Sequence, residues 1–162
     1  MKKFTLYSIL SALMLSALVI GCNQGNKGGD TPGGDTPAIN SPLVGVWEMK
    51  NMDGIPYPGD AKKDLFNPNS EFASGSQPYF YLASNGKAHY ALKDVNGNLT
   101  VKKPAYDYTI AGTKVTIGGV EFNFVITGNN VVLTGPGGKP IIKATKVEKP
   151  IGADIEAAPA IQ

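Results

Sequence analysis

The chain is short of the residue types that most often carry chemistry. It has one cysteine and one histidine, and none of its 15 basic residues is an arginine. One cysteine cannot build an internal disulfide framework, and one histidine leaves no second imidazole for a paired metal site. At 162 residues the chain is also too short for a multidomain enzyme of ordinary size. These shortages favour one small domain that is not an enzyme and holds neither metal nor cofactor.

Charged residues are scarce as well, because they make up only 17% of the chain. The net charge of the chain is +2. Removal of Lys2 and Lys3 would leave 13 lysines facing 13 acidic residues, so no electrostatic case for a nucleic-acid partner remains. Glycine and proline are abundant, at 20 and 12 residues, alongside seven tyrosines and six phenylalanines. This composition is typical of many short strands and turns, and it predicts an all-β fold.

The N-terminus has the layout of a secretory signal, with two lysines followed by the apolar run Phe4–Ile20. Seventeen helical residues span about 26 Å, just short of a bilayer core of about 30 Å, so length alone leaves an uncleaved membrane helix open. The only cysteine decides between a cleaved signal peptide and an uncleaved membrane helix, because it ends the sequence Val19-Ile20-Gly21-Cys22. This tetrapeptide resembles the lipobox of bacterial lipoproteins.

The resemblance implies that residues 1–21 are a signal peptide and that Cys22 becomes the lipidated first residue. The covalent diacylglycerol and an N-acyl chain would anchor the protein stably to a membrane without a protein span. Asn23 stands where the enterobacterial inner-membrane retention signal has aspartate, so the outer membrane is the expected location. The periplasmic face of the inner membrane is the alternative.

Two flanking segments lack the pattern of a folded core. Residues 22–42 are rich in glycine and proline, and Gly28–Pro32 is repeated as Gly33–Pro37, which indicates a flexible tether of about 25 Å r.m.s. span. Residues 148–162 are rich in alanine, proline and isoleucine without helical or strand periodicity. We expect them to form a flexible C-terminal tail.

Between these flanks, residues 43–147 show period-2 alternation with turn residues every seven to twelve positions. The expected strands are Leu43–Lys50, Pro78–Ala83, Ala88–Leu92, Leu99–Lys103, Ala105–Ile110, Val115–Ile117, Val120–Ile126, Val131–Thr134 and Pro140–Val147. Asn96-Gly97 supplies the positive φ angles of a tight hairpin, and Pro104 ends a strand or marks an edge. Eight or nine strands in simple succession predict a small antiparallel up-and-down β-barrel, with a β-sandwich as the alternative.

The first strand carries a second resemblance. Its Leu43-x-Gly45-x-Trp47 start, followed by successive hairpins, is similar to bacterial lipocalin-like lipoproteins. The resemblance implies that Gly45 and Trp47 belong to the fold signature and that Trp47 closes one end of the barrel. An arginine covers this tryptophan in lipocalins, and here Lys143 or Lys146 would have to take that place as a cation-π partner.

Candidates for chemistry each have a simpler structural explanation. His89 alternates with an apolar face and is expected to be solvated on the polar side of its strand. Asp94–Asn98 superficially resembles a calcium loop but has its glycine two places early, so a hairpin turn explains it. No serine stands in a Gly-x-Ser-x-Gly motif, and no metal ligands gather in the sequence.

Residues 51–77 form a long connection between two predicted strands. The segment contains enough apolar side chains to fold over the open end of a barrel as a lid or plug. Tyr57, Phe66 and Phe72 would supply the plug, and a short helix at Ala61–Phe66 is an option. An insertion packed on the outside is the competing interpretation.

Two functions follow for a membrane-anchored, non-catalytic lipoprotein. In the first, aromatic side chains fill the barrel, and a structural or host-facing surface protein contacts a protein partner through its outer face and loops. In the second, the barrel carries a small apolar or amphipathic ligand. The candidate lining residues are Tyr81, Tyr90, Tyr106, Tyr108 and Phe124. Twelve aromatic residues in residues 43–147 favour the filled barrel.

Overall fold

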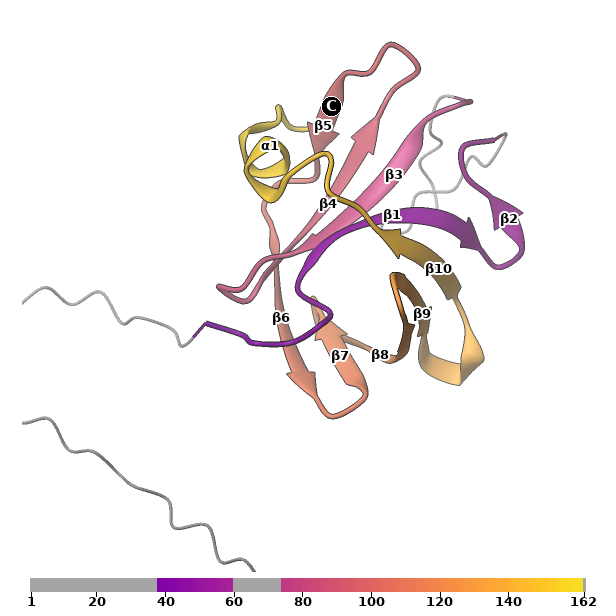
Figure 1. The fold of residues 1–162 in the computed structure, drawn as a ribbon, viewed down its shortest axis with the longest axis vertical. Coiled ribbons are helices and arrows are strands. Elements are labelled where there is room, and N and C mark those ends of the chain that lie inside the picture. Colours follow the sequence, from indigo (N-terminus) through magenta and orange to yellow (C-terminus); the bar gives the residue numbers. More distant parts are fainter. Residues whose placement is uncertain (1–37, 60–73, 162) are drawn as a thin grey trace, which may run out of the picture. The chain divides into compact units, whose positions relative to one another are not determined.

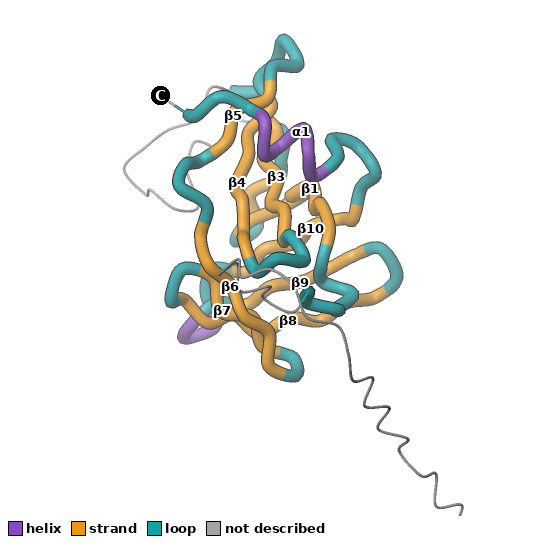
Figure 2. The backbone as a smooth tube through the Cα atoms, turned by 90° about the vertical axis from the view of Figure 1, so that its left-hand side faces the viewer, coloured by secondary structure: helices purple, strands orange, loops and turns teal. Residues whose placement is uncertain are grey.

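A computed structural model describes residues 38–59 and 74–161, which form the strands and helices shown in Figures 1 and 2. The strands are β1 (Gly45–Met52), β2 (Ile55–Pro56), β3 (Gln77–Leu82), β4 (Lys87–Lys93), β5 (Leu99–Val101), β6 (Tyr106–Ala111), β7 (Lys114–Ile117), β8 (Val120–Thr127), β9 (Asn130–Thr134) and β10 (Ile141–Lys146). A 3-10 turn, η1 (Pro136–Gly138), and one helix, α1 (Gly152–Ala157), complete the described elements. The predicted signal peptide, Cys22 and the repeat lie outside the described residues.

The sheet closes on itself. β1, β3, β4, β6, β7, β8, β9 and β10 pair in this order as antiparallel neighbours, and β10 returns to pair with β1. The closing pairs run from Trp47 opposite Lys146 to Met52 opposite Ile142. An eight-stranded antiparallel barrel results, as the succession of hairpins predicted, and closure leaves no free edge around the ring. The sandwich alternative is wrong.

Two described strands stand outside the ring. β5 pairs with Ala91–Lys93 of β4, while β6 pairs with Lys87 and Ala88 farther back on the same strand. β5 and β6, which the sequence predicted as separate strands, therefore both pair with β4, and Pro104 lies between them in the chain. The second extra strand, β2, was not predicted; it pairs with Asn51 and Met52 at the end of β1.

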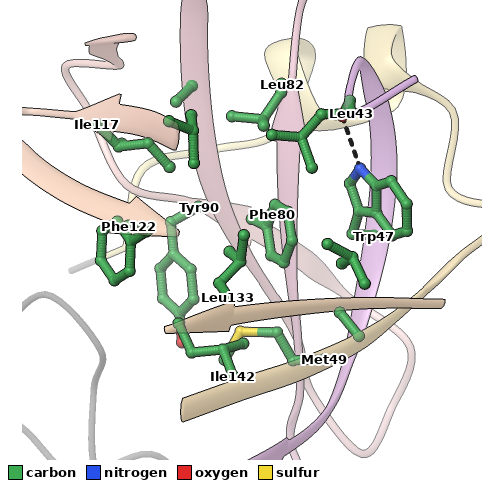
Figure 3. Close-up of a cluster of buried hydrophobic side chains, with 14 of the residues drawn as sticks. Leu43, Trp47, Met49, Phe80, Leu82, Tyr90, Ile117, Phe122, Leu133 and Ile142 are labelled. Atoms are coloured by element: carbon green, nitrogen blue, oxygen red, sulfur yellow. Dashed lines mark hydrogen bonds between the residues drawn. The ribbon is translucent and has the colours of Figure 1, made fainter. Parts of the chain in front are cut away.

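Side chains from all eight ring strands meet in one interior cluster (Figure 3). The fully or nearly fully buried members are Leu43, Trp47, Met49, Met52, Tyr57, Phe80, Leu82, Ala88, Tyr90, Tyr108, Val115, Ile117, Phe122, Val131, Leu133, Ile142 and Ala144. The rings of Trp47 and Phe80 stack with centroids 6.1 Å apart. The predicted inward face of β8 is right at Phe122, but Val120 is 44% exposed because it opens that strand directly after a glycine turn.

The C-terminal segment is not a free tail, which corrects the expectation for residues 148–162. It forms α1 on the outer side of the barrel, beside β4 and β5 in both Figure 1 and Figure 2. Ile155 is completely buried there, although it lies in a segment that lacks a long periodic pattern. The helix gains its stability by burying apolar surface against the sheet, which local sequence periodicity does not report.

The chain enters the barrel at one identifiable end. The Ile39 amide donates to the Ser84 carbonyl at 2.7 Å, in the turn between β3 and β4, and Leu43 is completely buried close behind. The Asp94–Asn98 hairpin and the beginning of residues 51–77 lie at the opposite end, where β4 and β1 finish. Ile39, near the start of the described chain, therefore lies at the Ser84 end of the barrel.

Candidate functional site

The five aromatic residues predicted to line an interior site do not all face inward. Tyr90 and Tyr108 are buried in the interior cluster, and Tyr106 and Phe124 pack against it while partly buried. Tyr81 lies on the outer face instead, packed against a second apolar cluster. The prediction for Tyr81 is therefore wrong, because its strand directs Phe80 and Leu82 inward and Tyr79 and Tyr81 outward.

Tyr108 has a structural anchor inside the barrel. Its hydroxyl donates to the Ala83 carbonyl at 2.7 Å, and burial raises the pKa of this phenol. A buried hydroxyl with a backbone partner is satisfied without a ligand. Tyr108 thus ties β6 to the end of β3 and adds to the filling of the interior.

The end of the barrel near Trp47 is closed by the residues that the sequence singled out. The indole Nε1 donates to the Leu43 carbonyl at 2.8 Å. The Lys146 ammonium lies 5.5 Å from the ring centroid and donates to the Pro42 carbonyl at 3.1 Å. Gly45 has a φ of +135° and no side chain, so Lys146 can cross directly over it. Lys146, rather than Lys143, thus occupies the place expected for a cation over the ring.

The opposite end receives the described parts of the long segment. Tyr57 belongs to the interior cluster, as expected of a plug. Gln77 is buried, and its side-chain amide donates to the carbonyls of Met49 and Pro78 at 2.7 and 3.0 Å. Phe66, Phe72 and the predicted helix at Ala61–Phe66 lie outside the described residues.

His89 is less solvated than predicted. It lies on the outer face of β4, as its alternation indicated, but its side chain is only 15% exposed. Its ring stacks on Tyr81 with centroids 5.6 Å apart, and its Nε2 lies 3.9 Å from a carboxylate oxygen of Glu156 on α1. Burial lowers the pKa of His89, and the positive charges of Lys103 and Lys87 act in the same direction against the opposing effect of Glu156.

Tyr81 shares this environment, and no pattern in the sequence groups it with His89 and Glu156. Burial raises the pKa of its phenol, and the nearby Glu156 carboxylate adds to the effect. The one signal that could have pointed to the group is the single histidine of the sequence. We call Tyr81, His89 and Glu156 the outer cluster.

The described residues offer little for metal chemistry. Across 38–59 and 74–161, no three histidine, cysteine, aspartate or glutamate side chains gather as metal ligands would. The Asp94 carboxylate instead accepts hydrogen bonds from Asn98 and from the Asn96 amide, and these bonds lower its pKa. Asp94–Asn98 is a hairpin turn, as predicted, with Gly97 at a φ of +87°.

In the part of the chain that the structure describes, no helix is long and apolar enough to cross a membrane.

Exposed ion pairs join neighbouring strands, with Lys87 and Asp107 at 2.6 Å and Lys114 and Glu121 at 2.8 Å. Such exposed pairs contribute at most about 1 kcal/mol each.

Comparison with known proteins gives no further guide to the site. No protein-family model matches the chain, and no curated protein matches it.

Proposed function

We propose that this protein is a lipid-anchored bacterial lipoprotein of the outer membrane whose lipocalin-like barrel is a non-catalytic interaction module. The observation that carries the proposal is the interior cluster, in which side chains from all eight ring strands pack together. An interior occupied by the protein's own aromatic and aliphatic side chains stabilises the fold and leaves the outer face and loops for contact with partners.

We assign the proposed contact with a protein partner to the exposed loops of the barrel, which include the Asp94–Asn98 hairpin and η1.

A second candidate function is that of a carrier, and one observation favours it. Four inward-facing side chains of β6 and β8 are only partly buried, namely Tyr106, Ile110, Phe124 and Ile126. This side of the interior is the part best suited to an apolar or amphipathic ligand. The two functions differ in a measurable property, which is saturable uptake of one apolar molecule per barrel.

The anchor is tested by the Cys22→Ser substitution. The wild type should be processed and should incorporate radioactive palmitate, while Cys22→Ser should remain as an unprocessed precursor without label. Asn23→Ser, one residue away, is the matched control and should be labelled like the wild type. Equal labelling of Cys22→Ser and wild type would overturn the proposed function.

A further inference from the structure

Two tight turns of the barrel contain an asparagine followed directly by a glycine, and the sequence holds no other such pair. They are Asn85-Gly86, between β3 and β4, and Asn96-Gly97, between β4 and β5. The glycine has a φ of 82° in the first turn and 87° in the second. Its amide donates to the carbonyl three residues earlier in both, at 3.1 and 3.0 Å. The two turns therefore share one backbone hydrogen-bond pattern, and only their surroundings differ.

An asparagine before a glycine can react with its own backbone. Glycine has no Cβ to obstruct the approach of its nitrogen to the asparagine Cγ. In the attack a C–N bond forms, the bond from Cγ to the side-chain nitrogen breaks, and the amide proton leaves with the departing ammonia. Water then opens the five-membered succinimide. Opening at Cγ gives aspartate, and opening at the main-chain carbon gives isoaspartate, whose backbone runs through Cβ.

The Asn85 turn is held closed by bonds that the Asn96 turn lacks. The Oδ1 atom of Asn85 accepts a hydrogen bond from the Lys87 amide at 3.1 Å. The Gly86 carbonyl accepts one from the Tyr108 amide of β6 at 2.8 Å, and Gly86 itself is half-buried. These contacts fix the side chain that would be attacked and tie the turn to a neighbouring strand.

The Asn96 turn projects beyond the barrel in Figure 1, and residues 95–98 are exposed. The Asp94 carboxylate accepts bonds from the amides of Asn96 and Asn98 at 2.9 and 2.8 Å. Within the described residues, no hydrogen bond holds the side-chain amide of Asn96. Beyond its chain neighbours, no atom lies within 4 Å of the place where Gly97 would carry a Cβ. The reacting side chain is therefore free to move and open to water.

We propose that Asn96 is a site of spontaneous modification, at which attack by the Gly97 nitrogen converts the asparagine to aspartate and isoaspartate while Asn85 is protected. The product gives the turn a second carboxylate beside Asp94, its only charged residue before the reaction. Isoaspartate also lengthens the backbone of the turn by one carbon. A loop assigned above to a protein partner thus changes its charge as the protein ages. The reaction needs neither lipid nor partner, so its failure leaves the proposed function standing.

Peptide mapping of the purified protein, incubated in mildly alkaline buffer, measures the modification at both sites. The Asn96 peptide should gain the mass of OH in place of NH₂ and separate into aspartate and isoaspartate forms. Asn85 is the internal reference in the same sample. It should react more slowly by a factor on the order of ten, because two additional hydrogen bonds oppose opening of its turn. An intact Asn96, or equal rates at the two sites, would overturn the proposal.

Two variants test the part played by the backbone nitrogen. Gly97→Asn keeps a residue that tolerates a positive φ but places a Cβ beside the attacking nitrogen, so the reaction at Asn96 should slow several-fold. Asn98→Ala removes the side-chain bond to Asp94 at 2.9 Å and should speed the reaction several-fold, because the turn opens more readily. A wild-type rate in Gly97→Asn, with aspartate as the sole product, would show direct hydrolysis by water and overturn the assigned mechanism.

Discussion

At the scale of single residues, the direction of a side chain could be predicted only where the two faces of a strand differ in character. On β8, Phe122, Phe124 and Ile126 alternate with polar or exposed neighbours, and their inward direction is confirmed. On β3, Tyr79, Phe80 and Tyr81 are all aromatic, so alternation carries no information there, and the inward direction predicted for Tyr81 is wrong. The aromatic rings of Tyr79 and Tyr81 can face outward on this strand because the C-terminal segment packs against them.

The register of β8 can be tested with one pair of neighbours. Phe122→Ala should lower the free energy of unfolding by about 3–5 kcal/mol, because it removes a buried ring from the interior cluster. Glu121→Ala should change it by no more than about 1 kcal/mol, since this carboxylate makes only an exposed ion pair with Lys114. Urea unfolding followed by the fluorescence of the single tryptophan measures both. A larger loss for Glu121→Ala would contradict the observed register.

Gly45 provides a second test at this scale. Gly45→Ala should cost about 1–3 kcal/mol of unfolding free energy, because a φ of +135° strains any residue with a side chain. Part of the loss arises from contact with Lys146, which crosses this position. The same substitution should therefore cost less in a Lys146→Ala background. An equal cost in both backgrounds would show that backbone strain alone explains the glycine.

At the scale of elements, the ring strands could be predicted, while the short additions could not. Alternation over four to eight residues, with Gly-containing turns, identified all eight ring strands and β5. β2 has only two residues and no periodic signal, and it exists because β1 continues into a tight turn at Asp53-Gly54. Helix α1 has only six residues, so it depends on the apolar outer wall that a distant part of the chain supplies.

The close contact between α1 and β3 predicts a local effect of a small substitution. Gly152→Ala should push the helix away from Tyr81 and open it without unfolding the barrel. Cleavage at Glu156 by a glutamate-specific protease should then be faster, because a protease needs the helix to open locally. Ala153→Ser, at an exposed position of the same helix, is the control and should cleave close to the wild-type rate. Equal rates for Gly152→Ala and wild type would show that the helix does not depend on this contact.

At the scale of the whole molecule, closure of the barrel joins the two ends of the folded domain. β1 and β10 pair directly, so the first and the last strand of the folded domain lie side by side. The sequence predicted this closure from the number of hairpins, because an open sheet of eight strands would leave two unpaired edges. Whether side chains or a ligand occupy the interior could not be predicted, since a ring of eight strands permits both.

Titration of an apolar fluorescent probe, a labelled fatty acid, tests the central claim that the barrel is filled. The chain without residues 1–22 retains every described residue of the barrel and avoids competition from its own lipid. The filled interior predicts weak adsorption that does not saturate, unchanged in Tyr106→Ala and Phe124→Ala variants that fold. Saturable one-to-one binding below about 10 μM, lost in those variants while folding is retained, would contradict the account and make the protein a carrier.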